Sequence, residues 1–535
     1  MHQLSKKKSI NTNYFYLIIL LTFLTILQRY FLFDITQWRE DQATTYWISY
    51  VNKISEINVG LISSRLIPNP NGLILYTKLF SFIPSFKLSI LFYSFSQILM
   101  IYYLFRFLDI KNRLTKILIF FSIVSSFYTS VSSLEIWAQF FFLSFNFVCL
   151  GFIFYSLKYK TVKILDLLML CLLTPSFYLG GFLNTLVFTL IFSFFIITKK
   201  IKVSFKLPKS FYDYCKFIFT IFLIYFVWAS YLSTVDLSSF LNRLESTQQA
   251  TNLIDIFKTL VFLNIDEIFT LHSDFSIYSS LTFLIYRFLN LSNKIIFLSF
   301  LILLLLIFVI SRGNIKNNFV QIKVLYSFIF LSTSISPLIG GENFFIKERT
   351  DVQLQFFPLT LLMIFLMIDS VSKNKIVRNI FNTCLFGYIF LNLIFSLNIY
   401  KDYLDYDGNL LSNSDVPLIY KYDVVEEIKN TAISKGLEVV SIYYDLGGTE
   451  MGWVEKFGYN YYPYYEYPFT YGRIFDLLLL KEHNLVNAQE GNKLRSVKSA
   501  DFVLTYKYHT KFDTKELKRY TTKEINRLRL FTVDK

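Results

Sequence analysis

The first apolar run of the chain, YFYLIILLTFLTILQRYFLF at residues 14–33, decides which solvent the fold is built for. A helix of about 20 such residues is about 30 Å long and matches the hydrocarbon core of a bilayer. The composition agrees, because 54% of the 535 residues are hydrophobic and only 17% are charged, against about 25% charged in soluble domains. The sequence therefore predicts a polytopic α-helical membrane protein.

Further apolar runs of similar character follow along the chain. The clearest, with the first, are 14–33, 86–105, 117–131, 136–156, 213–232, 294–311, 352–369 and 379–399. The longer stretch 165–197 is interrupted by TPSFYLGG and predicts two short helices folded back at the membrane surface. With the run 324–341, the sequence predicts about 11 membrane helices.

The positions of Lys and Arg predict the orientation, because cytoplasmic loops retain these residues. With the N-terminus inside, 22 of the 34 basic residues before residue 400 fall on the cytoplasmic side. They lie in the segments 6–8, 106–116, 158–163, 199–216, 312–323 and 373–378. A further run at 275–290 is interpreted as re-entrant or interfacial, which places the C-terminus outside. The richness in Phe, Ile, Lys and Asn indicates a bacterial source, so we expect an inner-membrane protein with a periplasmic C-terminus.

The sequence divides into two parts. Residues 1–399 form the expected transmembrane domain, with external loops at 34–85 and 233–280, of which the second contains a helix expected to lie flat on the membrane. Residues 400–535 have shorter apolar periods and predict a small external α/β domain. Its expected strands lie in 436–445, 500–509 and 526–535, and its expected helices in 423–434 and 514–527.

Several functional classes are excluded or unsupported. The net charge of +15 comes from the short basic loops, since residues 400–535 hold 19 basic and 20 acidic residues, and we therefore expect no nucleic-acid partner. Cys149, Cys171, Cys215 and Cys384 form no CxxC motif and are interpreted as small core hydrophobes. The four histidines are scattered, so no histidine metal site is predicted. There is no P-loop, which disfavours an ATP-driven pump.

A charged cluster follows the first span within FDITQWREDQATTYWISY at residues 33–50. It consists of Arg39, Glu40 and Asp41, and the same loop continues to NPNG at 69–72, just before the second span. One interpretation is that Asp41 only solvates the end of a helix. The other is catalytic, because an aspartate at the membrane surface can remove a proton from a hydroxyl that attacks a lipid-anchored substrate.

This arrangement resembles the membrane glycosyltransferases of the GT-C superfamily, such as protein O-mannosyltransferases and aminoarabinose transferases. The resemblance implies a polyprenyl-phosphate sugar as donor and a glycan, lipid or protein hydroxyl as acceptor, with inversion at the sugar. It also implies that the acid of the first external loop is the catalytic base. Asp41 matches that position, with Glu40 as the rival. We expect no cofactor, and the use of a divalent metal stays open.

Other residues on the expected external face extend this hypothesis. Glu135, between the third and fourth spans, matches a second acid of the family and is a candidate for positioning the acceptor, or a simple helix N-terminal acid. Lys347 and Arg349 precede the tenth span, where the family has a basic segment that neutralises the leaving phosphate. Thr350 replaces the aromatic residue expected there, and pairing with Glu348 or Asp351 is the alternative. Arg39, Arg65 and Asn69 are the remaining candidate substrate-binding residues.

Two other functions remain open from the sequence. A transporter or flippase of lipid-linked sugars would carry charges inside its spans and show symmetry between its halves, whereas these spans look nearly free of charge. An O-antigen-type polymerase would place its key arginines in later loops and need no acid after the first helix.

Overall fold

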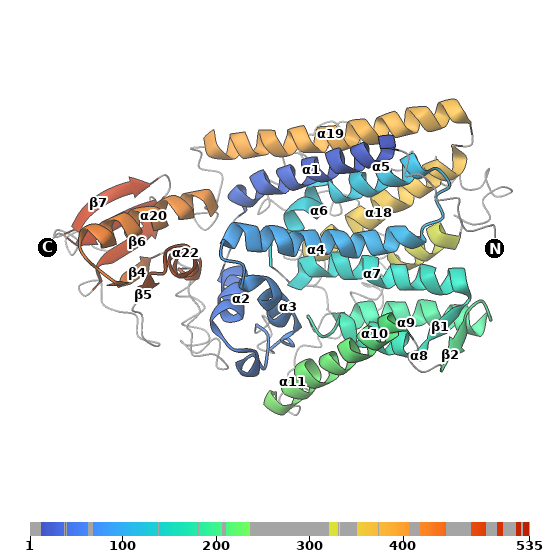
Figure 1. The fold of residues 1–535 in the computed structure, drawn as a ribbon, viewed down its shortest axis with the longest axis horizontal. Coiled ribbons are helices and arrows are strands. Elements are labelled where there is room, and N and C mark those ends of the chain that lie inside the picture. Colours follow the sequence, from blue (N-terminus) through green and yellow to red (C-terminus); the bar gives the residue numbers. More distant parts are fainter. Residues whose placement is uncertain are drawn as a thin grey trace, which may run out of the picture.

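The computed structural model describes residues 12–36, 38, 40–61, 68–136, 138–178, 181–205, 210–235, 320–329, 331, 350–372, 374–405, 418–445, 472–487, 500–506, 520–525 and 528–533. These residues are mostly helical. Figure 1 shows an elongated bundle whose helices run roughly parallel to its long axis, with a small α/β unit at one end and the N-terminus at the other. All statements below concern these residues.

Four helices of the described residues are long and apolar enough to cross a membrane: Tyr14–Ile35, Phe86–Phe107, Asp213–Thr234 and Lys375–Ile394. They lie in α1 (Thr12–Ile35), α4 (Phe86–Phe107), the run from α10 (Phe211–Phe222) to α11 (Ser230–Thr234), and α19 (Lys375–Asp405). The expectation of a helical membrane protein is therefore supported, but the described residues do not give 11 spans. The predicted span 294–311 and the run 275–290 lie outside them, as does most of 233–280.

Several predicted spans correspond to shorter or broken helices. The run 117–131 is broken, because α5 (Arg113–Val124) ends before Ser125 and α6 (Phe127–Ser132) is only 6 residues long. The Ser126 hydroxyl donates to the Ile123 carbonyl at 2.8 Å, which offers the backbone an alternative to a continuous helix. The interruption predicted at TPSFYLGG is confirmed, since α8 (Ile164–Leu173) and α9 (Gly181–Ile197) flank it.

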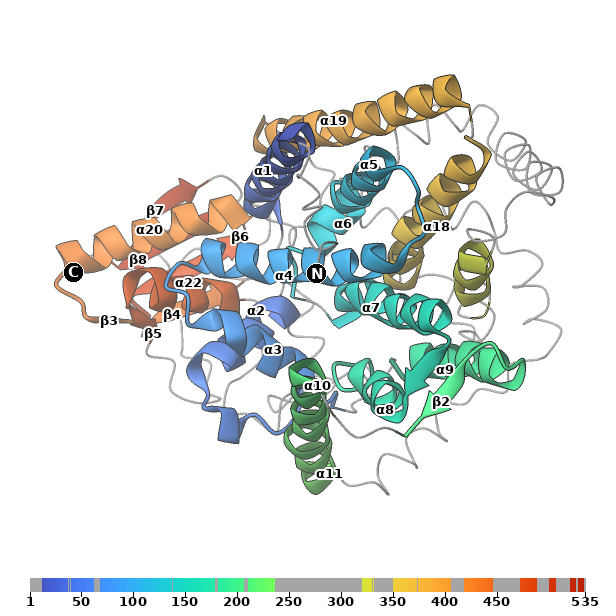
Figure 2. The same ribbon diagram turned by 45° about the vertical axis from the view of Figure 1, so that its right-hand side comes forward.

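Helices far apart in sequence form the two sides of the bundle. α4 lies centrally beside α7 (Ala138–Tyr159), while α1 packs along α19. Figures 1 and 2 both show α1, α5 and α19 on one side of α4, with α8, α9 and α10 beyond α7 on the other. α18 (Thr350–Val371) lies between α5 and α7 and packs against both. The outward face of α10 carries exposed apolar side chains such as Phe211 (86%) and Ile218 (65%), as expected for a surface covered by lipid.

The segment between α1 and α4, which we call the first loop, is structured. It contains α2 (Glu40–Val51), a 3₁₀ turn (Ile54–Glu56) and α3 (Gly72–Ser81). The sequence had indicated that NPNG leads directly into the second span. In the structure it leads into α3, which precedes that span. α3 has 10 residues, about 15 Å of helix, and Pro84 lies in the turn between it and α4.

The C-terminal α/β unit has helices α20 (Leu418–Ser434) and α22 (Arg473–His483) beside its strands. The strands are β3 (Val439–Val440), β4 (Ile442–Asp445), β5 (Val486–Asn487), β6 (Phe502–Tyr506), β7 (Tyr520–Ile525) and β8 (Leu528–Val533). They form a four-stranded sheet of order β4-β6-β8-β7, in which only the β4–β6 pair is parallel, and a separate parallel pair β3–β5. The helix predicted over 514–527 is wrong where the structure describes it, because Tyr520–Ile525 is strand β7. β-branched Thr521 and Thr522 favour that strand, and β8 pairs with it.

The α/β unit and the adjoining end of the bundle share one apolar core. A single cluster of buried residues runs from Phe33 and Tyr46 to Val424 and Leu504. The two sequence-defined parts are therefore in continuous contact. A second cluster fills the other half of the bundle, around Ile119, Phe147 and Phe188. Two short strands, β1 (Thr161–Lys163) and β2 (Lys202–Ser204), pair in parallel at that other end.

Candidate functional site

The two candidate bases lie in the first turn of α2. Glu40 is the first residue of this helix and Asp41 the second. The structure describes their backbone but not their side chains. Both residues are therefore helical, and their place in the secondary structure does not separate the two candidates. Carboxylates at this position are favoured by the helix dipole. Arg39, Arg65, Lys347 and Arg349 lie outside the described residues.

Glu135, the candidate from the second loop, between the third and fourth predicted spans, lies beside that same turn. Its side chain is buried, with 6% of the residue exposed. Its Oε2 accepts a hydrogen bond from Gln42 Nε2 at 3.1 Å. Gln42 directly follows Asp41 in α2, so the structure brings the acid of the second loop next to the helix that carries the two acids of the first.

The turn that carries Glu135 is fixed by hydroxyl groups. Ser133 and Ser94 are 2.6 Å apart between their Oγ atoms, which ties the end of α6 to α4. Ser126 Oγ also lies 2.8 Å from Thr129 Oγ1 within the break between α5 and α6, so the two hydroxyl groups form a hydrogen bond. Because these groups are buried, their hydrogen bonds are costly to break, and they hold the backbone next to Glu135 in place.

A fully buried arginine lies beneath this turn. Arg29 of α1 is 2% exposed. Its Nε donates to Ser94 Oγ at 2.9 Å and Ser133 Oγ at 3.2 Å, and its Nη2 donates to the Val124 carbonyl at 2.9 Å. A cation is favoured at the carbonyl end of a helix, here the end of α5. Arg29 thus stabilises the break between α5 and α6.

Gln28 makes the adjoining connection. Its Nε2 donates to the Ser125 carbonyl at 3.0 Å and to Ser396 Oγ of α19 at 2.8 Å, while its Oε1 accepts from Ser130 at 3.1 Å. Neighbouring side chains of α1 thereby satisfy the backbone that is freed where α5 ends. A lone charge inside an apolar run is a recognised functional signal, and Arg29 could have been identified from the sequence in this way.

The NPNG segment closes the first loop on itself. Asn69 Nδ2 donates to the Leu61 carbonyl at 2.9 Å, and the Asn69 carbonyl accepts from the Gly60 amide at 2.6 Å. A Cβ on Gly60 would lie 2.5 Å from the Pro70 carbonyl oxygen, so only glycine fits there. These contacts give Asn69 a structural role, and a contact with substrate stays a prediction.

Asn71 of the same motif, which the sequence reasoning passed over, reaches a second element. Its Nδ2 donates to the Ile57 carbonyl at 2.6 Å and to the Phe226 carbonyl at 3.1 Å. Phe226 lies in the π-helical stretch Leu223–Ala229 between α10 and α11, and π-helical turns are frequent at functional sites. Gly72 packs against the turn after α8, where a Cβ would lie 2.3 Å from the Ser176 oxygen. NPNG is thus the point where the first loop, the α8–α9 turn and the seventh predicted span meet.

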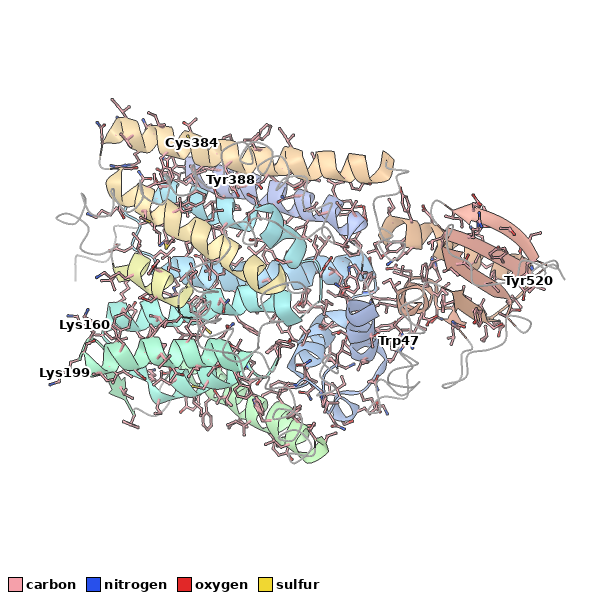
Figure 3. All side chains as sticks on the ribbon, turned by 180° about the vertical axis from the view of Figure 1, so that it is seen from behind. Trp47, Lys160, Lys199, Cys384, Tyr388 and Tyr520 are labelled. Carbon is pink, nitrogen blue, oxygen red and sulfur yellow. The ribbon has the colours of Figure 1, made fainter. Side chains whose placement is uncertain are left out.

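The α/β unit docks directly on the first loop. Lys421 Nζ donates to the Trp38 carbonyl at 3.2 Å, and the Phe86 amide donates to Glu482 Oε1 at 2.7 Å. The guanidinium of Arg473 lies 4.9 Å from the ring centre of Trp47 on α2. In Figure 3, Trp47 lies where the bundle meets the α/β unit. α2 is therefore held between the bundle and the C-terminal unit.

Lys481 is the most perturbed cation at this junction. It donates to the Ser81 carbonyl at 2.8 Å and lies 4.5 Å from the ring centre of Tyr50. Burial lowers the pKa of Lys481 to about 8, against a smaller opposing effect of the neighbouring Glu482.

Charged side chains are also buried within apolar helices at the opposite end. Lys216 of α10 is 2.5 Å from Asp166 of α8, and Lys163 is 2.6 Å from Asp213, so two ion pairs connect these helices reciprocally. Arg29, Asp166 and Lys216 are thus charges within apolar helices and qualify the expectation that the spans are nearly free of charge, whereas Lys163 lies in β1 with 33% of its side chain exposed. The spacing is visible in the sequence as KILD at 163–166 and DYCK at 213–216, but their pairing is not.

The cysteine interpretation is also partly wrong. Cys149 is buried in the bundle, whereas Cys171, Cys215 and Cys384 are exposed on the surfaces of apolar helices. An apolar run does not reveal which of its faces is covered by protein and which by lipid.

The arrangement therefore places the buried carboxylate of Glu135 beside the N-terminus of α2. This helix is held between the bundle and the C-terminal α/β unit. Comparisons with protein-family models, with curated proteins and with solved structures find no match to this chain.

Proposed function

We propose that this chain is an integral-membrane glycosyltransferase of the GT-C type. It moves a sugar from a polyprenyl-phosphate donor to an acceptor hydroxyl, with Asp41 as general base and Glu40 as the rival. Glu135 positions the acceptor, and Arg349 with Lys347 neutralises the leaving phosphate. The topology that belongs to this proposal has about 11 spans, a cytoplasmic N-terminus and a periplasmic C-terminal unit in a bacterial inner membrane.

One observation carries the proposal. The hydrogen bond from Gln42 to Glu135 at 3.1 Å joins the acid-bearing loops after α1 and α6. Two segments about 90 residues apart in the sequence thus meet where the backbone of α2 begins with Glu40 and Asp41. Catalysis by a general base requires such a group within hydrogen-bond reach of the proton that it removes.

The proposed step balances without a further reactant. The Asp41 carboxylate accepts the proton of the acceptor hydroxyl while the acceptor oxygen bonds to the anomeric carbon. The bond from that carbon to the phosphate oxygen breaks, and polyprenyl phosphate leaves with the electron pair. Because attack and departure take place on opposite faces, the configuration at the sugar inverts.

The test is sugar release from labelled polyprenyl-phosphate sugars by the purified full-length protein. Asp41→Asn keeps the size of the side chain and removes the proton acceptor, so transfer is expected to fall by about 10²–10⁴-fold while donor binding persists. Glu135→Gln is expected to cost less. Glu438→Gln serves as the matched control, because Glu438 is an exposed acid in the α/β unit.

Near-normal transfer by both Asp41→Asn and Glu40→Gln would remove the catalytic acid from the first loop. The transporter of lipid-linked sugars would then be the better proposal. The buried pair of Asp166 and Lys216, 2.5 Å apart in apolar helices, favours that alternative, because charges inside spans often mark a transport path. An assay of lipid-linked sugar movement across vesicles would test it.

A further inference from the structure

The pairing of β1 with β2 brings two lysine-rich segments to one edge of the molecule. Thr161 is in register with Lys202, and the Lys202 amide donates to the Lys160 carbonyl at 3.0 Å. The edge carries five exposed lysines, which we call the basic edge: Lys158, Lys160, Lys199, Lys200 and Lys202. Figure 3 shows Lys160 and Lys199 together at the end of the bundle opposite Tyr520 of the α/β unit.

Within the described residues, none of these five lysines forms an ion pair. Two carboxylates near this end are already paired, Asp166 with Lys216 and Asp213 with Lys163. The positive charge of the basic edge is therefore not neutralised by the described part of the chain.

Helix ends account for part of this clustering. Lys160 and Lys199 follow α7 and α9, and both have a φ of 55°, a left-handed conformation more usual for glycine at the end of a helix. The dipole of each helix favours a cation at its carbonyl end. That explanation covers one lysine per helix and leaves the other three without an ion-pair partner in the described residues, although Lys200 lies 5.9 Å from the ring centre of Phe195.

Exposed apolar side chains lie next to these lysines. Ile197 is 77% exposed, Phe205 78% and Phe211 86%, and Tyr159 is 55% exposed between Lys158 and Lys160. Aromatic and aliphatic side chains beside lysines are typical of a surface at the level of lipid headgroups, where the apolar part enters the membrane and the ammonium groups stay in the polar layer.

We propose that the basic edge binds the phosphate groups of anionic phospholipids. Each ammonium offers three donors to phosphate oxygens, and the negative potential of an anionic leaflet attracts a basic cluster of this kind. The binding is electrostatic and reversible, and it does not depend on the glycosyl-transfer proposal.

The test is native mass spectrometry of the full-length protein in a neutral detergent, titrated with phosphatidylglycerol or phosphatidylcholine. Wild-type protein is expected to retain phosphatidylglycerol preferentially, and raising the salt from about 50 mM to about 500 mM is expected to abolish the preference. The triple variant K160Q/K199Q/K202Q is expected to bind phosphatidylglycerol about 100-fold more weakly.

Two variants serve as controls. K53Q/K429Q/K523Q removes the same number of charges outside the basic edge and is expected to bind like wild type. K160R/K199R/K202R retains the charges and is expected to keep the preference. Equal phosphatidylglycerol binding by the triple glutamine variant and the distant control would overturn the proposal.

Two further outcomes would also overturn it. One is a wild-type lipid preference that does not respond to salt, which decides the matter even where the glutamine variant does not fold. The other is full displacement of the lipid by millimolar inorganic phosphate, which would indicate a site for free phosphate.

Discussion

The two ends of the helical bundle differ in what covers them and in how many of their charged side chains remain exposed. At the end of α1 and α2, the α/β unit continues the apolar core over buried polar groups, among which Glu135 accepts from Gln42, and Asp34 of α1 pairs with Lys87 of α4 at 2.8 Å. At the end of β1 and β2, carboxylates and lysines pair in salt bridges while five other lysines remain exposed.

This difference indicates what covers each end. The first end is covered by protein, because α22 and α20 supply both apolar contacts and hydrogen bonds to the first loop. The second has no such cover in the described residues and carries the charge pattern of a surface that meets water and lipid headgroups. An end covered by protein can hold buried carboxylates in a fixed geometry, as the proposed chemistry requires.

The largest effect is expected from breaking a buried ion pair at the basic end. Asp166→Ala leaves the ammonium of Lys216, whose side chain is 9% exposed, without its partner. The expected loss in the free energy of unfolding is about 3–5 kcal/mol, measured by denaturant unfolding in detergent with tryptophan fluorescence. If Asp166→Ala left the free energy of unfolding unchanged, ion pairs would not stabilise the basic end, and this difference between the two ends would be contradicted.

The reversed pair D166K/K216D is the control for this change, since it restores opposite charges between α8 and α10. It is expected to recover part of the stability lost in Asp166→Ala. Recovery would show that the interaction between the charges, and not the aspartate alone, stabilises this end.

A medium effect is expected at the covered end, where Asn71 links the first loop to the π-helical stretch. Asn71→Ala removes the donor to the carbonyls of Ile57 and Phe226, and leaving buried acceptors unpaired costs about 1–3 kcal/mol. Hydrogen exchange is expected to accelerate in residues 223–229. Asn69→Ala removes the side-chain bond to Leu61, leaves the bond from Asn71 to Phe226 in place, and is the control, with protection of 223–229 unchanged.

The smallest effect is a pH dependence of docking at the same end. The pKa of Lys481 is about 8 in the folded protein against an ordinary value of 10.5, so the unfolded chain binds the proton more tightly between these values. Stability of the docked α/β unit should therefore rise with pH from about 8 to 10, as measured by denaturant unfolding. Lys481→Met should flatten this rise, and an unchanged slope would contradict the burial of Lys481 as its cause.

Sequence patterns predicted local structure where local rules are sufficient. TPSFYLGG was correctly predicted to separate two helices, and the alternating runs in 436–445, 500–509 and 526–535 contain strands. The prediction failed at Tyr520–Ile525, because a segment with mixed helix and strand preference takes its conformation from its partner β8. It failed at Ser125 because serine side chains and Arg29 compete with the helical hydrogen bonds.

The candidate site shows the same division. The sequence identified the acids Glu40, Asp41 and Glu135, since an acid at the end of an apolar run stands out against its surroundings. It could not predict that Gln42 contacts Glu135, that Arg29 contacts the Val124 carbonyl, or that Asn71 contacts the Phe226 carbonyl. Each of these contacts joins segments tens of residues apart.

The sequence by itself therefore determined the solvent, the helical character and the segregation of lysines, because apolar run length and charge are properties of short stretches. Only the tertiary structure decided which loops meet, that α2 lies beneath the α/β unit, and that Asp166 and Asp213 are paired with lysines. The physical reason is that partners for buried polar and charged groups are chosen by packing in three dimensions, which a local sequence pattern does not encode.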